Sequence, residues 1–377
     1  MVYLQGGPGK SSMFGQFLES GPLAVDSHGK LHRRPHTVQK IFNVVYVDQP
    51  AGAGFSFTKS AAGYARSSAD CAKGLREFLR QLLIVFPELR NRPLYVAGES
   101  YGSRVAVALA HSLLTNPDPA VPLKLSGVIA CSPVLGKAID LLDSADSLYH
   151  MGMLDPHGRR TFSMAIQRVR DMWGVNHTGA LYLLSHTIFS LHPTPSAFCR
   201  LTGYQDHASL LSDRKPAEFV QYYRYMQKPL LKRSLHLSSH AQVDSKRLRV
   251  ILHLANDFTV DLRDQVQALL EATRMLVFSG QLDTVFPVVK QEAYMLSLNW
   301  TGGETLRKAP RKHWYEEGPG SRLLGYVKKS NDLTYVVLTR AGHHAWADAS
   351  ETVSKMVERF ASGVDVLSPN RKVKGVN

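Results

Sequence analysis

The sequence of 377 residues has little cysteine and lacks any long apolar run. Its three cysteines, Cys71, Cys131 and Cys199, allow at most one disulfide, and the sequence alone does not select the pair. None of them has the CxxC or CxxH spacing that is typical of a metal site. No window approaches the roughly 18–20 apolar residues that a membrane span needs. The sequence therefore excludes a disulfide framework and an integral membrane protein.

Acidic residues are also in the minority, since 45 lysines and arginines stand against 31 aspartates and glutamates and give a net charge of +14. Such a charge would suit an anionic partner, but the basic residues are spread along the chain. The densest basic group lies beside Trp314 and consists of Arg307, Lys308, Arg311 and Lys312. We interpret it as the solvated edge of a hairpin. No helix-turn-helix, zinc-finger or RNA-binding signature is present, so nucleic acid is not an expected partner.

Strands and helices alternate over the first part of the chain. An apolar run at residues 43–48 predicts a buried strand, and apolar residues at three- and four-residue spacing predict a helix from Ser67 to Phe86. A short strand at residues 94–97, a second helix and a strand at residues 125–131 follow. This order is typical of a parallel sheet with helices on both faces.

The alternation is interrupted in the middle of the sequence and resumes afterwards. We expect a helical cap insertion at residues 145–245, because the apolar spacing there is helical and no clear strand appears. The sheet-forming core then has two parts, residues 1–144 and 246–368, and residues 369–377 form a basic tail. In the second part we expect strands Met275–Ser279 and Thr334–Leu338, a hairpin near residues 314–328 and a last helix at residues 347–360.

The first residues, Met1 to Leu4, have the character of a buried strand that runs directly into a glycine-rich loop. A domain rarely begins within a strand, because the remaining strand edge would need a partner. We therefore expect that N-terminal strands, and any signal peptide, are missing from this chain.

The residues from Gly98 to Gly102, Gly-Glu-Ser-Tyr-Gly, lie between a predicted strand and a predicted helix. This motif in this place is typical of a nucleophile elbow, a sharp turn that projects the serine hydroxyl from the sheet. The start of the helix beneath Ser100 also favours negative charge that develops there. The motif predicts that Ser100 is a catalytic nucleophile.

A catalytic serine needs a base, and the base needs an orienting acid. In folds of this kind the three residues follow the chain order Ser, Asp, His. Asp283 and His343 each lie just after a predicted strand, at the sheet edge that is expected to carry Ser100. We predict that these three residues form a triad. The neighbouring His344 is interpreted as a structural residue.

The loop Gly6–Gly9 follows a strand and can direct a backbone N–H toward a developing oxyanion. The N–H of Tyr101, the residue after the nucleophile, is the expected second donor. The alternative is an ordinary glycine turn, and the elbow favours the catalytic role.

Five blocks of the sequence, in order and over nearly the whole chain, resemble the serine carboxypeptidases: residues 5–15, 48–56, 98–101, 280–283 and 341–343. The Leu-Gln-Gly-Gly-Pro-Gly and Gly-Gln-Leu-Asp segments are most similar to the vitellogenic-like branch. The resemblance implies an α/β-hydrolase fold with a helical insertion and the removal of single residues from peptide C-termini at acidic pH. It also implies a lysosomal or extracellular location in the secretory pathway, and no metal or other cofactor. The triad would be Ser100, Asp283 and His343, with Gly7 and Tyr101 at the oxyanion hole.

The same matching implies that Gln5, Gly6 and Glu99 hold the terminal carboxylate of the substrate, with Glu19 behind them. An ionised Glu99 would repel that carboxylate, whereas a protonated Glu99 can donate a hydrogen bond to it. Two neighbouring carboxyls push one pKa upward, which keeps a proton available to higher pH. We therefore expect peptide affinity to weaken as the pH rises through that pKa.

The chain departs from the family pattern at several positions. Lys10 stands where a small residue or cysteine is common, and it either helps to hold a substrate anion or points to water. The run from His344 to Asp348 replaces a typical Met-Val-Pro run and alters the wall of the pocket. Two alternatives stay open: a catalytically impaired homologue that binds or scaffolds a partner, and an acyltransferase that uses the same triad.

The expected partners are peptide or protein C-termini, and a homodimer is also compatible with the resemblance. Asn176 and Asn299 each begin an Asn-x-Thr sequon. Both are glycosylation candidates if the protein is secreted.

Overall fold

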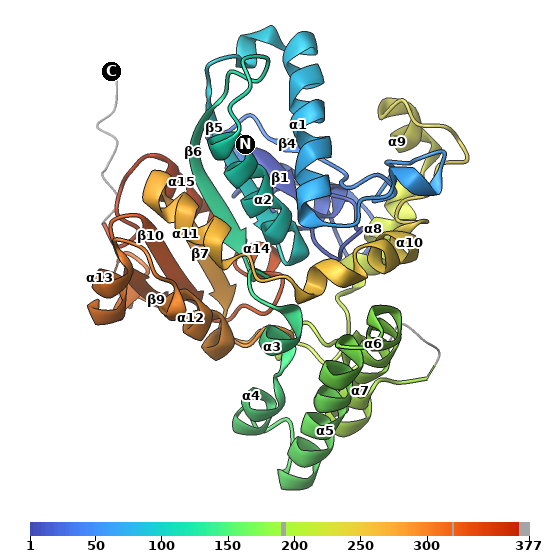
Figure 1. The fold of residues 1–377 in the computed structure, drawn as a ribbon, viewed down its shortest axis with the longest axis vertical. Coiled ribbons are helices and arrows are strands. Elements are labelled where there is room, and N and C mark those ends of the chain that lie inside the picture. Colours follow the sequence, from blue (N-terminus) through green and yellow to red (C-terminus); the bar gives the residue numbers. More distant parts are fainter. Residues whose placement is uncertain (190–193, 319, 369–377) are drawn as a thin grey trace.

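The computed structural model describes residues 1–189, 194–318 and 320–368 and is built on one eight-stranded sheet (Figure 1). The strand order is β4-β1-β5-β6-β7-β10-β9-β8. The strands are β1 (Val2–Leu4), β4 (Val45–Tyr46), β5 (Pro93–Glu99), β6 (Lys124–Cys131), β7 (Met275–Gly280), β8 (Lys312–Tyr315), β9 (Leu323–Lys329) and β10 (Leu333–Leu338). A separate two-stranded sheet pairs β2 (Leu23–Val25) with β3 (Leu31–Arg33).

The six strands from β4 to β10 in this order pair in parallel, and β9 and β8 continue the sheet antiparallel. This arrangement confirms the mostly parallel sheet and the hairpin near residues 314–328. Strand β1 pairs with β4 on one side and with β5 on the other, so the outermost strand on this side is β4. The glycine loop that follows β1 therefore begins inside the sheet, next to the end of β5.

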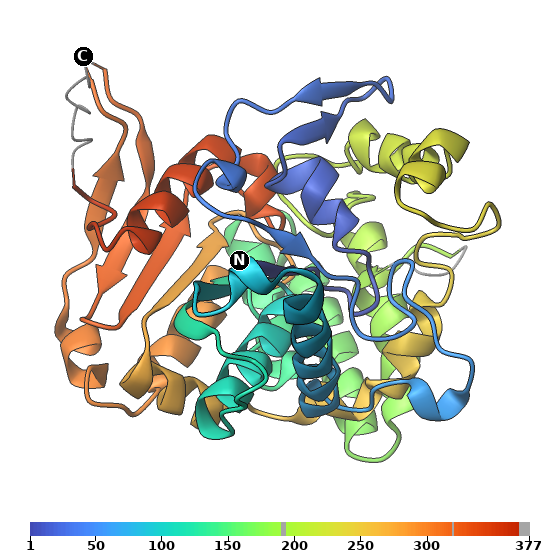
Figure 2. The same cartoon turned by 90° about the horizontal axis from the view of Figure 1, so that it is seen from above.

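Helices cover both faces of the sheet, as Figure 2 shows with red α15 on one side and blue-green α1 and α2 on the other. Side chains of β6 alternate between the faces: Ile129 packs in the cluster of α15, while Val128 packs in the cluster that contains α11. The helices of the core are α1 (Ser68–Val85), α2 (Tyr101–Thr115), α11 (Arg263–Ala272), α12 (Val288–Ser297), α13 (Gly303–Lys308), α14 (Ala345–Asp348) and α15 (Ser350–Ala361).

The local sequence of helix α1 determines where the helix begins, which face is buried and where it ends. The hydroxyl of Ser67 caps the helix by accepting a hydrogen bond from the N–H of Asp70 at 3.1 Å. The side chains of Leu75, Leu79 and Leu83 form its buried stripe. Pro87, two residues after the last helical residue, prevents continuation. The predicted helix from Ser67 to Phe86 is confirmed within one residue at each end.

Between β6 and β7 the described residues contain helices and no strand, and Figure 1 shows them beside the sheet and below it. In addition to α11, they are α3 (Ala138–Leu142), α4 (Ala145–His150), α5 (Pro156–Trp173), α6 (His177–Leu184), α7 (Ala197–Thr202), α8 (Ala217–Met226), α9 (Pro229–Ser234) and α10 (Arg247–His253). Short turns of other helix types are η1 (Gly15–Glu19), η2 (Val38–Lys40), η3 (Ala61–Gly63), η4 (Pro87–Leu89), η5 (Ser185–Phe189) and η6 (Ala255–Thr259).

Three further sequence predictions concern the cysteines, membrane spans and the C-terminal tail. Cys71, Cys131 and Cys199 are all free thiols. Among the described residues, no helix combines the length and the apolar character needed to cross a bilayer. The basic tail at residues 369–377 lies outside the part of the chain that the structure describes. The boundaries of the helical insertion stay predictions.

Candidate active site

Ser100 lies at the sharp turn between β5 and α2, with φ +55° and ψ −124°. A positive φ is uncommon for a residue with a side chain and is often found at functional sites. Close packing enforces the turn, because a methyl group at Gly98 would lie 2.3 Å from the carbonyl carbon of Gly102. The backbone therefore has the strained geometry that the Gly-x-Ser-x-Gly motif predicts.

His343 and Asp283 meet at the carboxyl end of the sheet, after β10 and β7. Nδ1 of His343 lies 2.9 Å from Oδ2 of Asp283. The other oxygen of Asp283 accepts hydrogen bonds from the N–H groups of Val285 and Phe286 at 2.8 and 2.9 Å. Since Asp283 is 1% exposed and His343 7% exposed, the pair is shielded from water and its geometry is fixed. An aspartate in this position selects one tautomer of the imidazole, with the proton on Nδ1.

Two consecutive residues at the end of β6, Cys131 and Ser132, connect the backbone of the elbow to that of His343. The N–H of Ser100 donates to the carbonyl of Cys131 at 2.9 Å, and the hydroxyl of Ser132 donates to the carbonyl of His343 at 2.9 Å. The N–H of His343 in turn donates to Ala208 in the helical insertion at 2.8 Å. The sheet and the insertion thus jointly position the histidine.

The glycine loop packs directly against the elbow. A methyl group at Gly6 would lie 2.7 Å from Cβ of Ser100 and 3.0 Å from the backbone nitrogen of Tyr101. Gly7 has φ +123°, which a residue with a side chain rarely adopts. Tyr101 begins α2, so its N–H has no acceptor within the helix. The structure therefore brings the loop of Gly7 and the N–H of Tyr101 to the same place as Ser100.

The four residues expected to hold a substrate carboxylate form a buried cluster beside the elbow. Glu19, at the end of η1, and Glu99, at the end of β5, are both fully buried. The side-chain amide of Gln5 donates to Glu19 at 3.1 Å and its carbonyl accepts from the N–H of Gly6 at 2.7 Å. The hydroxyl of Tyr3 also donates a hydrogen bond to Glu19. The structure thus brings Gln5, Gly6, Glu19 and Glu99 together.

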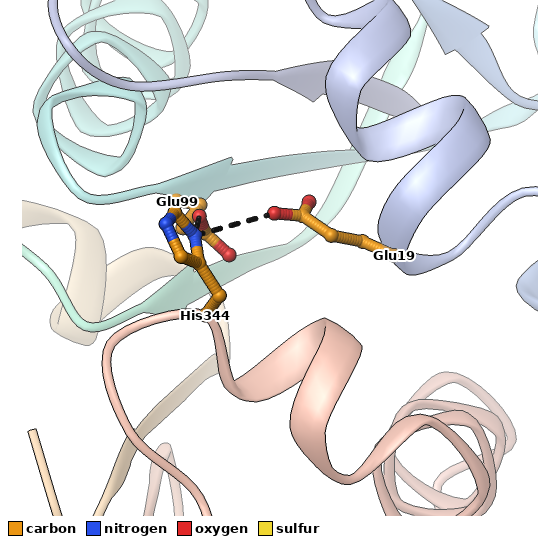
Figure 3. Close-up of side chains that lie close together, drawn as sticks. All are labelled: Glu19, Glu99 and His344. Atoms are coloured by element: carbon orange, nitrogen blue, oxygen red, sulfur yellow. Dashed lines mark hydrogen bonds and ion pairs between the residues drawn. The ribbon is translucent and has the colours of Figure 1, made fainter. Parts of the chain in front are cut away.

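His344 completes this cluster, as Figure 3 shows. Its Nδ1 lies 2.8 Å from Oε1 of Glu99 and 3.6 Å from Oε1 of Glu19. Burial and the negative charge of Glu19 raise the pKa of Glu99 to about 7. Burial acts against the charge of His344, but the two carboxylates outweigh it and raise its pKa to about 10. The imidazole in turn holds the pKa of Glu19 below its usual value despite the burial of that group.

The donor atoms of Glu19, Glu99 and His344 lie within 4.8 Å of one another, and no other group of three described His, Cys, Asp or Glu residues has such a spacing. The contact of Nδ1 with Glu99 has the length of a charge-assisted hydrogen bond. We therefore interpret the cluster as an ion pair and not as a metal site.

Aromatic side chains line the same region. The rings of Phe14 and Phe219 each lie 5.3 Å from that of His344, and Phe219 comes from α8 of the helical insertion. The Nζ of Lys10 lies 3.8 Å from the centre of the Phe14 ring. Burial and the neighbouring Arg247 lower the pKa of Lys10 to about 8. Lys10 is therefore packed over an aromatic face instead of extending into water.

A buried ion pair supports the helix behind the nucleophile. Arg104, fully buried in α2, donates from Nε to Asp257 at 2.6 Å and from Nη2 to the carbonyl of the same residue at 2.7 Å. Asp257 also accepts hydrogen bonds from the hydroxyl of Tyr101 at 2.7 Å and from the N–H of Ser68 at 2.8 Å. This network fixes α2 to η6 and α1 and so stabilises the position of the elbow.

Sequence reasoning gave no role in the site to His344, Phe219 or Asp257. For His344 a signal was present, because it directly follows a predicted catalytic histidine and replaces the family's usual apolar residue. Phe219 and Asp257 lie in segments whose contacts with the site depend on tertiary structure alone.

Comparisons with known proteins agree over nearly the whole chain. A family model described as "Serine carboxypeptidase" matches residues 1–363. The venom serine carboxypeptidase of Apis mellifera is 29% identical over 364 residues, which cover 96% of this chain and 77% of that protein. The vitellogenic carboxypeptidase of Aedes aegypti is 26% identical over 368 residues, which cover 96% of this chain and 76% of that protein.

A solved structure is also similar. The prohormone-processing carboxypeptidase of Saccharomyces cerevisiae aligns with a TM-score of 0.77 at 21% sequence identity, and the alignment covers 98% of this chain and 84% of that chain. At this identity the likeness concerns the fold. Together with the mostly parallel sheet, it confirms the predicted α/β-hydrolase architecture.

Proposed function

This chain belongs to the serine carboxypeptidase family and is a serine-type hydrolase of peptide C-termini, and from this premise we propose that Ser100, Asp283 and His343 carry the reaction. The observation that supports this assignment most directly is the buried contact of His343 with Asp283 at 2.9 Å, beside an elbow that holds Ser100 in a strained conformation. A histidine oriented in this way is the base that a serine nucleophile needs.

In the proposed mechanism the hydroxyl oxygen of Ser100 attacks the carbonyl carbon of the last peptide bond, and His343 takes its proton. The N–H groups of Gly7 and Tyr101 stabilise the oxyanion that forms. His343 then gives the proton to the leaving amine, the C–N bond breaks, and an acyl-enzyme remains. Water, deprotonated by the same histidine, attacks the acyl group and restores Ser100.

We further propose that Gln5, Gly6, Glu99 and Glu19 bind the terminal carboxylate of the peptide. The pKa of about 7 for Glu99 supports this assignment, because a protonated Glu99 donates to the carboxylate and an ionised one repels it. Affinity should therefore be highest below pH 7 and should weaken above it. A Michaelis constant that stays flat from acid to neutral pH would contradict this proposal.

The decisive test of the nucleophile is covalent labelling with a fluorophosphonate probe. We expect labelling of the unaltered chain, loss of labelling in Ser100→Ala, and full labelling in Ser212→Ala, whose serine is exposed. Mass spectrometry of a peptide substrate should show release of single C-terminal residues. A folded protein that is not labelled would support the non-catalytic alternative, and products carrying an added hydroxyl acceptor would support acyl transfer.

Location and assembly are further proposals. Family members are secreted or lysosomal enzymes, and we propose the same route for this protein. Asn176 and Asn299 are both exposed, which is compatible with glycosylation. Glycosidase treatment of the protein from its host should lower its mass if they are used. The homodimer stays a prediction that light scattering in solution tests.

A further inference from the structure

The charge balance of the carboxylate site depends on a residue outside the proposed set. Among the described residues, His344 is the only side chain of a basic residue that forms an ion pair with Glu19 or Glu99. The remaining partners of the two acids are uncharged: Tyr3 and Gln5 donate to Glu19, and the thiol of Cys131 lies 3.9 Å from Glu99. Two buried acids with no cation would carry at least one uncompensated charge unless both were protonated.

The position of the imidazole leaves one of its nitrogens available. Nδ1 contacts the carboxylates, whereas Figure 3 shows the other ring nitrogen on the side of the ring away from Glu19. No hydrogen bond from this Nε2 to another described residue is found, and 16% of the His344 side chain is exposed. The rings of Phe14 and Phe219, which lie 4.9 Å from each other, both pack against the imidazole at 5.3 Å and favour this orientation.

We propose that His344 is a substrate-binding residue of this enzyme, whose imidazolium donates a hydrogen bond from Nε2 to the terminal carboxylate of the peptide while Nδ1 remains on Glu99. This inference rests on the proposed function and adds to it a fixed cation in the carboxylate site. The carboxyl pair alone would offer the substrate a negative or neutral surface. With the imidazolium balancing the ionised Glu19, and with Glu99 protonated, the empty site has no net charge, so the carboxylate of the peptide meets no net negative charge when it binds.

The protonation states that follow distinguish this site from a simple carboxyl pair. Below pH 7, Glu99 is protonated and His344 is charged, so both can donate to the substrate. Between pH 7 and 10 the proton of Glu99 is lost, but the imidazolium remains. The other titratable groups that face His344 from the surrounding elements are Lys10, Glu19, His207, His343 and Asp348, while Tyr3 and Cys131 face the two glutamates. Binding should therefore weaken near pH 7 without disappearing.

The test measures binding and does not depend on turnover. Calorimetry with Ser100→Ala protein gives the Kd of an N-acetylated dipeptide and of its C-terminal amide from pH 5 to 9. In Ser100→Ala/His344→Asn, the amide of asparagine can still donate to Glu99 but carries no charge. We expect the free-acid peptide to bind at least about tenfold more weakly at pH 6, as for loss of a charge-assisted hydrogen bond. The amide peptide should change less than about twofold.

A second signature concerns the pH dependence. The cation of His344 lowers the pKa of Glu99, so its removal should shift the midpoint of the affinity curve to higher pH. A merely structural role would weaken the acid and the amide equally and leave the midpoint in place, and this result would overturn the proposal. The matched control, Ser100→Ala/His150→Asn, changes an exposed histidine of α4 and should behave like Ser100→Ala.

The protein without substitution at His344 supplies an independent measurement if the asparagine variant does not fold. Its preference for the acid over the amide should decrease near pH 7 and persist at pH 8.5. Complete loss of the preference just above pH 7 would overturn the proposal. Failure of the proposed function would look different: the chain would bind the peptide with this preference but show no hydrolysis and no labelling of Ser100.

Discussion

Replacing Asp283 by asparagine tests whether His343 acts as a base, with almost no change of shape. Oδ1 of Asp283 accepts two backbone hydrogen bonds, from Val285 and Phe286, and Oδ2 faces Nδ1 of His343. In the variant the amide oxygen keeps the two backbone bonds, so the NH2 group must face the imidazole. It donates to Nδ1, which moves the ring proton to Nε2. That nitrogen can then no longer accept the proton of Ser100.

The expected effect is large. Loss of the correct tautomer in a Ser-His-Asp triad lowers kcat by about 10⁴, which is about 5.4 kcal/mol in activation free energy. Because both backbone bonds persist, the melting temperature should change little. The assay is steady-state hydrolysis of an N-blocked dipeptide, with thermal unfolding measured on the same samples.

Asp118→Asn is the matched control for this experiment. Asp118 also accepts a bond from the N–H two residues later, that of Ala120 at 2.8 Å, but its ion-pair partner is Arg76 and not a histidine. Its kcat should stay within about twofold of the unaltered chain, because it lies outside the triad. A folded Asp283→Asn protein with kcat within tenfold of the unaltered chain would refute the assignment of His343 and Asp283.

Three further predictions concern stability and packing. Gly6→Ala places a methyl group 2.6 Å from the carbonyl oxygen of Glu99, so it should lower the free energy of unfolding by about 1–3 kcal/mol and reduce kcat. As its control, Gly74→Ala adds a methyl group with no atom within 4 Å and should stabilise α1 by about 0.5–1 kcal/mol. Arg104→Met leaves the carboxylate of its buried partner without a cation, so the free energy of unfolding measured in urea should decrease by about 3–5 kcal/mol. A decrease below about 1 kcal/mol would contradict the role of the buried pair. Because the pKa of His344 is raised in the fold, its charged form stabilises the protein fully below pH 6.5, and this stabilisation is lost as the pH rises toward 10. In His344→Asn, the free energy of unfolding should therefore decrease less over that pH range.

The sheet and the assigned triad were predictable because they depend on local patterns and on one topological rule. Apolar runs located β5, β6, β7 and β10, and the residue after each strand then had to lie at the same edge of a parallel sheet. That rule alone brings Asp283 and His343 together, although 60 residues separate them. The elbow was equally accessible, since the small residues around Ser100 encode the turn itself.

The proposed carboxylate site was only partly predictable, because its residues come from elements that the sequence does not relate to one another. Glu99 and His344 are 245 residues apart, and their contact depends on the course of the chain between β10 and α14. Among 16 histidines, periodicity and spacing do not distinguish one whose ring is turned toward buried acids. The side chain of Lys10 presented the same difficulty, since its position over Phe14 is a matter of rotamer and packing.

Two pairs of consecutive residues connect binding to chemistry in this site. Glu99 precedes the assigned nucleophile Ser100, and His344 follows the assigned base His343, while the ion pair of Glu99 with His344 joins the two segments at 2.8 Å. A shift of either segment would therefore move a binding group and a catalytic group together. For this reason we expect a substitution that breaks the ion pair to change kcat as well as the Michaelis constant, even though neither Glu99 nor His344 takes part in proton transfer. A substrate without a terminal carboxylate should likewise react more slowly, because it lacks the contact that aligns its carbonyl with Ser100.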